Sequence, residues 1–197
     1  GELRDTVRGK ASAVKHAFAL NNTHDRGIET VSYRFRFESG LSASGVWIKL
    51  VSTPEGAPAA LMVHDKGKAA VGADVIERIY RGEQVLVADP IFVGDSEFPS
   101  PGQANYARMV YTVGERPLGL QAAQLAALSG WLRKAHGAPT VRIEASGMRT
   151  QIMTLVAAAL HPEAFGELVI RDGVGSLGAL LENGVKFESA PELFCLD

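Results

Sequence analysis

The sequence predicts an α/β protein, a three-layer α/β/α sandwich whose mainly parallel sheet carries an antiparallel hairpin at its N-terminal edge. The chain has 197 residues, of which 46% are hydrophobic and 21% charged, so it is long enough to bury the core of one domain. From residue 59 onwards, short apolar runs alternate with segments of helical spacing. Because alternating strands and helices form βαβ units, helices are expected on both faces of the sheet.

The N-terminal part divides into a polar segment, residues 1–26, and the start of a domain that covers residues 27–197. The polar segment is expected to be irregular or partly helical, with a helix over Ala11–Leu20. In "VSYRFRFES", residues 31–39, apolar and polar side chains alternate, which is typical of a half-exposed antiparallel strand. The expected partner of this strand is "GVWIKLVST", residues 45–53, so the two form the predicted hairpin.

The remainder of the chain supplies the parallel part of the sheet. Continuous apolar runs at residues 59–64 and 84–89 predict strands that are buried on both faces. Residues 92–118 are rich in Gly and Pro and are expected to form a loop, longer than compact domains usually keep without a purpose. Further strands are predicted at 140–145 and 167–172, and helices at 71–83, 120–134 and 150–160.

The composition excludes several classes of partner and site. The net charge of −2 gives no basis for binding nucleic acid or an anionic membrane. Cys195 is the only cysteine, which excludes an intrachain disulfide and a cysteine-based zinc site, and neither a metal nor a cofactor is predicted. No apolar run reaches the roughly 20 residues that span a bilayer. A soluble protein is expected, and its compartment stays open because a cleaved export signal would precede Gly1.

Candidate site residues lie just after the predicted strands, since ligands bind at the carboxyl ends of the strands in open α/β sheets. The turn "HDKGK" follows the strand at 59–64, and its residues His64, Asp65 and Lys66 would either offer backbone N–H groups to an oxyanion or form a polar turn. Asp89 ends the next strand, and the turn after it would form either a cleft wall or a structural turn.

The third junction, "EASGM", resembles the sharp strand-to-helix turn that presents a nucleophilic serine in many hydrolases. Ser146 occupies the place of the nucleophile, but Glu144 and Met148 stand where the pattern has glycines. If the turn is instead placed by the length of the following helix, it falls at Gly147–Met148, where no nucleophile is present. Both alignments are incomplete.

A rival motif follows the strand predicted at 167–172. Gly173, Gly175 and Gly178 form the G-x-G-x-x-G pattern between a strand and a helix, the context of a dinucleotide-binding fingerprint. That fingerprint normally opens a fold with several further βα units, whereas 19 residues follow Gly178 here. A glycine-rich strand-to-helix loop is the favoured alternative.

Several of these segments together resemble the α/β-hydrolase superfamily, and within it the acetyl xylan esterase-like (cephalosporin deacetylase-like) proteins. The similar segments are the paired N-terminal strands, "PAALMVHDKGK" before the oxyanion turn, "RGEQVLVAD" followed by "GDSE", and the helix "MTLVAAALHP". The resemblance covers about residues 28–175.

The resemblance implies hydrolysis of a carboxylic ester by a Ser–His–Asp triad, with backbone donors holding the oxyanion. It places the nucleophile near Ser146, with Gly147 and Met148 beside it, and the oxyanion turn at His64–Lys66. Asp172 would be the acid in a variant arrangement. The family's histidine follows the acid in the chain, but the only histidine after the turn is His161. It ends the helix, about 15 Å from its start, and is too far away to act as the base.

Three functional hypotheses follow. The first is a hydrolase-like domain, incomplete at its C-terminus or degenerate, that lacks a competent triad and binds a small ester or carbohydrate. The second is an active carboxylic-ester hydrolase, a deacetylase of carbohydrate esters, whose histidine comes from outside this chain. The third is a nucleotide-binding domain. A sheet that lacks its last strands would leave an exposed edge, for which a homo-oligomer is expected.

Overall fold

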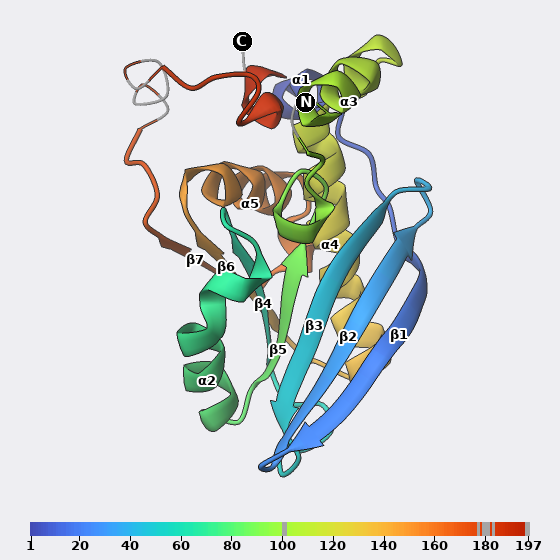
Figure 1. The fold of residues 1–197 in the computed structure, drawn as a ribbon, viewed down its shortest axis with the longest axis vertical. Helices are drawn as coiled ribbons and strands as arrows, with labels where there is room; N and C mark the ends of the chain where they lie inside the picture. The colour runs from blue at the N-terminus through green and yellow to red at the C-terminus, as the bar shows by residue number, and fades with distance from the viewer. Residues whose placement is uncertain (100–101, 177, 179–181, 183, 196–197) are drawn as a thin grey trace.

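The structure is a computed structural model that describes residues 1–99, 102–176, 178, 182 and 184–195. Its centre is a seven-stranded sheet with the strand order β1-β2-β3-β5-β4-β6-β7 (Figure 1). The strands are β1 (Val14–Asp25), β2 (Ile28–Phe37), β3 (Ser42–Leu50), β4 (Ala59–His64), β5 (Gln84–Asp89), β6 (Val141–Ser146) and β7 (Glu167–Arg171). The α-helices are α1 (Glu2–Thr6), α2 (Gly72–Tyr80), α3 (Gly102–Thr112), α4 (Pro117–His136) and α5 (Met148–Leu160).

The sheet is mixed, with a parallel half and an antiparallel half. β5, β4, β6 and β7 run parallel, while β1, β2, β3 and β5 pair with their neighbours antiparallel. The register places Val31 of β2 opposite Trp47 of β3, and His64 of β4 opposite Ser146 of β6. Because β4, β5 and β6 are parallel neighbours, their carboxyl ends meet at one edge of the sheet, where the candidate residues were expected.

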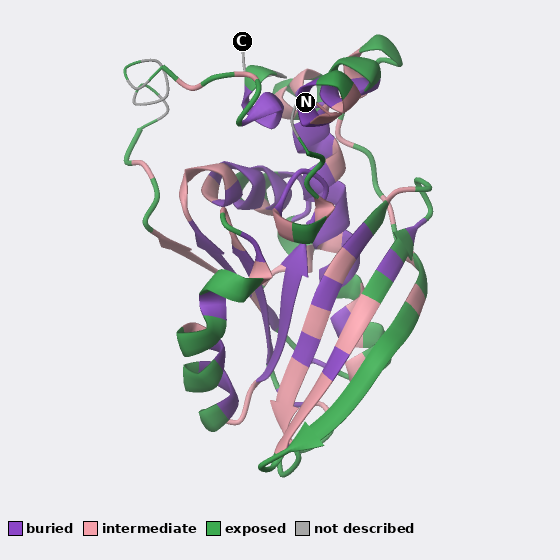
Figure 2. Cartoon of the chain, viewed as in Figure 1, coloured by how far each residue is buried: buried purple, intermediate pink, exposed green. Residues whose placement is uncertain are grey.

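Helices cover both faces of the sheet, as the alternation of strands and helices predicts. On one face, Val75 and Ile79 of α2 pack against Met62 and Val87 of the sheet. On the other face, α4 and α5 bury a larger apolar cluster that includes Ile143 of β6 (Figures 1 and 2). The continuous apolar runs of β4 and β5 are therefore explained, since both strands are buried on both sides. No helix in the described part of the chain is long and apolar enough to cross a membrane.

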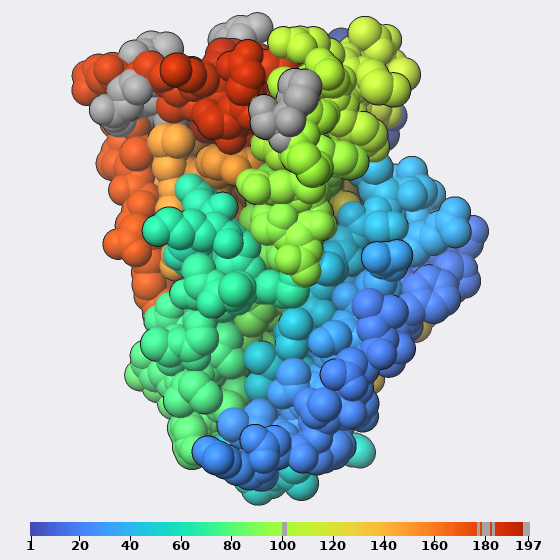
Figure 3. Space-filling view, viewed as in Figure 1, coloured from blue at the N-terminus to red at the C-terminus, as the bar shows by residue number. Residues whose placement is uncertain are grey.

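Two predicted segments need correction. Residues 11–20 are not helical, because Val14–Asp25 form strand β1, which pairs with β2 along its length and turns the predicted hairpin into three antiparallel strands. The expected loop at 92–118 contains helix α3, and α4 already begins at Pro117. The helix α3 and the C-terminal segment, residues 184–195, form the end of the molecule that lies beyond the carboxyl ends of the parallel strands (Figure 3).

Candidate active site at the carboxyl ends of β4 and β6

The turn between β6 and α5 has the outline of a nucleophile elbow, with glycine at the bend. Ser146 is the last residue of β6 and is 8% exposed, and Met148 is the first residue of α5. Between them, Gly147 adopts φ 106° and ψ 168°, a backbone conformation that residues other than glycine rarely adopt. The residue at the bend therefore carries no hydroxyl, and Ser146 lies one position before it.

Asp65 occupies the space in front of this bend. Its carboxylate accepts hydrogen bonds from the backbone N–H of Arg149 (3.1 Å) and of Thr150 (2.8 Å), and from the Thr150 hydroxyl (2.8 Å). A Cβ on Gly147 would lie 2.4 Å from the Asp65 carboxyl carbon. The carboxylate thus caps the first turn of α5, where a negative charge is favoured by the helix dipole.

The backbone donors of the two turns are used within the protein. Gly147 N–H donates to the Arg171 carbonyl at 2.9 Å, and Asp65 N–H donates to the Ser146 carbonyl at 3.0 Å. Lys66 N–H donates to His64 Nδ1 at 2.9 Å, and Gly67 N–H donates to the His64 carbonyl at 2.8 Å. An oxyanion at either turn would have to compete with these bonds.

The structure brings His64 close to Ser146 in a way that the sequence analysis did not anticipate, because the two residues are opposite each other in the β4–β6 register. His64 Nδ1 accepts a hydrogen bond from Lys66 N–H, so the neutral ring carries its proton on Nε2. In that form Nε2 is a donor and not a base. His161 ends α5, as predicted, and its buried ring has a lowered pKa because of desolvation.

Asp172 lies at the same edge of the sheet, one position after Arg171, whose carbonyl accepts the Gly147 N–H. It follows β7 directly, is exposed, and adopts φ 51°, a conformation that is uncommon for a residue with a side chain. The residues that do converge at the carboxyl ends of β4 and β6 are His64, Asp65, Ser146, Gly147 and Met148, whereas the Lys66 side chain is exposed.

A second polar cluster, missed by the sequence analysis, surrounds Lys68. Its ammonium group contacts Asp89 Oδ2 (2.9 Å), the Ser44 hydroxyl (3.1 Å) and Asp95. Although burial alone would lower it, the pKa of Lys68 is raised, because the two carboxylates stabilise the charged form. Lys68 is therefore a charged donor, and the pair Ser44–Lys68 does not have the neutral amine that a serine–lysine dyad requires. The signal for this cluster was the position of Lys68 and Asp89 after neighbouring strands.

Asp89 combines the two roles considered for it. Its carboxylate also accepts the N–H groups of Lys68 (2.8 Å) and Asp95 (2.9 Å), and a Cβ on Gly94 would lie 2.4 Å from Asp89 Oδ2. These bonds make it the centre of a structural turn. The same turn, through Asp95 and Ser96, forms one wall of an open cavity.

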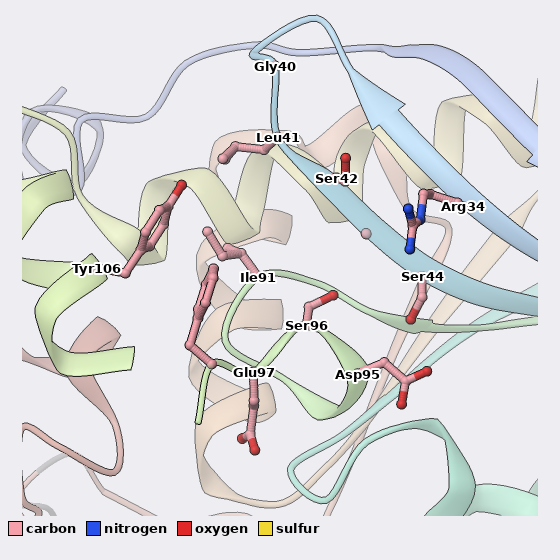
Figure 4. Close-up of a pocket in the computed structure, with 12 residues that line it drawn as sticks. Arg34, Gly40, Leu41, Ser42, Ser44, Ile91, Asp95, Ser96, Glu97 and Tyr106 are labelled. Carbon is pink, nitrogen blue, oxygen red and sulfur yellow. The ribbon is translucent and has the colours of Figure 1, made fainter. Parts of the chain in front are cut away.

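That cavity has a volume of about 380 Å³ and lies beside the ends of β2, β3 and β5 (Figure 4). Two aromatic rings, Phe98 and Tyr106, lie parallel in its wall, with centroids 4.7 Å apart and planes 22° apart. Figure 4 shows Tyr106 on one side of the cavity and Arg34 and Ser44 on the other. The polar side chains that line it are Arg34, Ser42, Ser44, Asp95, Ser96 and Glu97.

The glycine-rich segment after β7 is held against α5. Gln151 accepts a hydrogen bond from Val174 N–H (2.6 Å) and donates one to the Val174 carbonyl (2.8 Å). A Cβ on Gly173 would lie 2.1 Å from Gln151 Oε1, so the close packing of Gln151 accounts for a glycine at this position. Gly175 and Gly178 are described, but residues 177 and 179–181 of the expected helix lie outside the described residues. Within the described part of the chain, no group of three or more His, Cys, Asp or Glu could hold a metal ion.

Comparison with solved structures places this arrangement in a known fold. The acetyl xylan esterase from Paenibacillus sp. R4 matches 98% of this chain and 64% of its own length, with a TM-score of 0.68 and 12% identity. The fold is that of an α/β-hydrolase. The hydrolase fold is shared with a cold-adapted esterase from an Arctic intertidal metagenomic library, which matches 79% of this chain and 65% of its own length (TM-score 0.62, 12% identity).

Acetyl xylan esterase 1 from Thermoanaerobacterium sp. JW/SL YS485 matches 85% of this chain and 54% of its own length (TM-score 0.57, 14% identity). This chain therefore spans less than two thirds of the length of each of these three proteins. No protein-family model and no curated protein matches its sequence. The predicted resemblance is confirmed at the level of the fold, while the identities of 12% to 14% carry no conclusion about activity.

Proposed function

We propose that this chain is a hydrolase-type domain that binds a carbohydrate or carbohydrate ester without hydrolysing it. The observation that carries the proposal is the position of the Asp65 carboxylate on the N–H groups of Arg149 and Thr150. In hydrolases of this fold, the N–H of the residue after the nucleophile stabilises the oxyanion, together with an N–H from the turn after an earlier strand.

Both alignments of the elbow support this proposal. If Ser146 is in the nucleophile position, the required donor is Gly147 N–H, which binds the Arg171 carbonyl. If the bend residue Gly147 is in that position, no hydroxyl is present there, and the Asp65 carboxyl carbon lies 2.4 Å from the place of a Cβ. A carboxylate at this place would repel a second negative charge, and a serine without a general base is a weak nucleophile.

The proposed ligand site is the cavity between Arg34 and Tyr106. Hydroxyl, carboxylate and guanidinium groups line it together with an aromatic wall, and sugars present both hydroxyl groups and apolar ring faces to such surfaces. Because two of the similar enzymes are named acetyl xylan esterases, we choose xylose-based oligosaccharides and their acetyl esters as the ligands to test.

Catalysis is tested by turnover of p-nitrophenyl acetate with purified protein and its Ser146→Ala variant. The expected result is the same low rate for both proteins, indistinguishable from buffer. Turnover that disappears in Ser146→Ala would overturn the non-catalytic proposal.

Binding is tested by calorimetric titration with acetylated and deacetylated xylo-oligosaccharides. Arg34→Gln is expected to weaken binding about tenfold, which corresponds to the loss of one charged hydrogen bond. Arg36→Gln is the matched control, because Arg36 is exposed on the same strand but does not line the cavity. Equal effects of the two variants, or no heat of binding at all, would contradict the assignment of this cavity.

The second candidate is an active carboxylic-ester hydrolase whose histidine comes from outside this chain. It is favoured by the position of Ser146 at the carboxyl end of β6. It is also favoured because the similar enzymes are longer, so that this chain matches 54% and 64% of the lengths of the two acetyl xylan esterases. This candidate predicts serine-dependent turnover once the missing histidine is supplied by a longer chain or a partner.

Nucleotide binding through Gly173, Gly175 and Gly178 is the least supported candidate, because Val174 N–H is already bound to Gln151. Thermal unfolding with NAD or ATP tests it, since a ligand at 100 times its Kd stabilises a protein by roughly 2.7 kcal/mol. No shift in Tm is expected.

A further inference from the structure

The first turn of α5 carries an arginine that binds the protein's own C-terminal segment. Arg149 Nε donates to Glu192 Oε1 at 2.6 Å, and Nη1 donates to Glu97 Oε1 at 3.2 Å. Its remaining nitrogen, Nη2, donates to the Phe92 carbonyl at 2.7 Å, which holds the guanidinium in one orientation. The Arg149 side chain is 11% exposed and that of Glu192 is fully buried. The arginine therefore donates one charged hydrogen bond to a buried carboxylate, while its other two nitrogens bind Glu97 and the Phe92 carbonyl.

This carboxylate is bound in an environment that is unfavourable for a negative charge. Burial raises the pKa of Glu192, nearby Asp65 raises it further, and Arg149 opposes both effects. Two further carboxylates, Asp65 and Glu97, bind the backbone N–H and the guanidinium of the same arginine. The attraction of Arg149 for Glu192 is thus partly cancelled by like charges around it.

Glu192 lies in the C-terminal segment, residues 184–195, which packs against α3 and α4. Ala190 and Leu193 are buried, the Tyr111 hydroxyl donates to the Pro191 carbonyl at 2.9 Å, and Phe187 lies beneath Arg108. The regular structure of its described residues is one short 3-10 helix, Pro191–Cys195, and no strand, so the segment is expected to open more readily than the sheet.

We propose that Arg149 is the centre of a carboxylate-binding site, and that Glu192 is its internal ligand, which a carboxylate from another molecule displaces. The ligand class is a small organic carboxylate, because that group reproduces the contact that Glu192 makes with Arg149. The inference does not depend on the proposed carbohydrate site, since none of the residues involved other than Glu97 lines that cavity.

An internal ligand competes at the effective concentration of its tether, which is in the millimolar range for short linkers. The apparent affinity of an external carboxylate is then lowered by the small fraction of molecules in which the segment is open. Removal of the Glu192 charge is therefore expected to increase the affinity for acetate.

The test is a titration of the full chain with sodium acetate, in which the Tm is measured at each concentration. A parallel titration with sodium chloride at the same ionic strength is the reference. Glu192→Gln is expected to lower the half-saturating acetate concentration by about tenfold or more relative to the unmodified protein. Glu188→Gln, an exposed carboxylate in the same segment, is the matched control and is expected to change nothing. In Glu192→Gln combined with Arg149→Lys, which removes the Nε–H that binds Glu192, the acetate response is expected to disappear.

A second measurement keeps the proposal testable if Glu192→Gln does not fold. Trypsin cleavage after the exposed Lys186 of the unmodified protein is expected to accelerate with acetate but not with chloride, because acetate releases the segment. The proposal is overturned if Glu188→Gln and Glu192→Gln respond alike, if the arginine variant keeps the response, or if acetate leaves the cleavage rate unchanged. None of these outcomes bears on ester turnover or on oligosaccharide binding.

Discussion

Asp65 joins two parts of the chain through one carboxylate, because it follows β4 and binds two N–H groups and a hydroxyl in the first turn of α5. Asp65→Ala would leave the N–H groups of Arg149 and Thr150 without this partner. The free energy of unfolding is expected to fall by about 1–3 kcal/mol, as for the loss of a helix cap with charged hydrogen bonds. Urea denaturation measures it.

Asp25→Ala is the matched control, since Asp25 is an exposed aspartate at the end of β1. Its expected change is within about 0.5 kcal/mol. Equal losses for the two variants would show that Asp65 is a surface residue without a special role, and would also remove the main support for a blocked oxyanion position.

His136 links stability to pH at the opposite end of the parallel strands. Its ring stacks on Trp47 (centroids 4.2 Å apart) and meets Trp131 edge to face, and burial, followed by the charge of Lys49, lowers its pKa. The unfolded chain, with a histidine pKa near about 6.5, binds the proton more readily than the folded protein. The stability is therefore fully present above about pH 6.5 and is lost as the pH falls toward the lower pKa of the folded state.

Urea denaturation at several pH values between about 5 and 8 tests this dependence. His136→Gln is expected to flatten the decrease on the acid side, although His161, whose pKa is also lowered by burial, leaves some of it. His16→Gln, at an exposed histidine of β1, should not flatten it. A pH dependence that is identical in all three proteins would refute the assignment to His136.

At the scale of elements, α2 is attached to the sheet by charges as well as by apolar packing. Glu144 of β6 is 2% exposed and binds Arg78 of α2 (2.7 Å) and Arg171 of β7 (3.1 Å). Glu144→Gln would leave Arg78 buried without its nearest counter-charge, because its other ion pair, with Glu83, is 3.9 Å long. The expected loss of stability is about 3–5 kcal/mol.

The matched control is Glu77→Gln, which breaks a largely exposed pair with Arg81 on the same helix. Its expected effect on the free energy of unfolding is about 0.5 kcal/mol or less. Similar losses for the two variants in urea denaturation would mean that the Glu144 cluster contributes no more than a surface ion pair.

The sequence predicts elements well where burial imposes a pattern on them. The apolar runs of β4 and β5 are bounded in the structure by the residues that the sequence predicts, since both faces of these strands are covered. In β1, by contrast, no residue is fully buried, so no period-two pattern arises and its alanines and leucine favour a helix in isolation. Pairing with β2 overrides that preference. The position of α3 was obscured by the Gly and Pro that precede it.

The location of the candidate site was predictable from the sequence, but the hydrogen bonds within it were not. The carboxyl-end rule for parallel strands leads directly to His64, Asp65 and Ser146. The hydrogen bonds of Asp65 with Arg149 and Thr150, and the contact of Arg149 with Glu192, join residues that are 43 or more positions apart in the sequence. No local pattern predicts such contacts, so they emerge only from the packed molecule.

For the molecule as a whole, the outermost parallel strand determines the expected assembly. β7 ends the strand order, and among the described residues no strand pairs with its outer side. It has five residues, of which Glu167 and Arg171 are charged, and Val169 is at its centre. An open edge of this kind pairs with another chain unless a charge interrupts it, so we expect a homo-oligomer that forms through β7.

Sedimentation velocity over a range of protein concentrations measures this assembly. Val169→Lys places a charge at the centre of the open edge and is expected to shift the protein to the monomer. Val169→Thr is the matched control, because it retains the β-branched shape and adds no charge, and it should leave the assembly unchanged. A protein that is monomeric at all concentrations would show that the ends of β7, with Glu167 and Arg171, already suffice to prevent pairing. A dimer that persists in Val169→Lys would place the contact elsewhere on the surface. The exposed apolar side chains of Met109 in α3 and of Val113, which follows α3, would be the next to test.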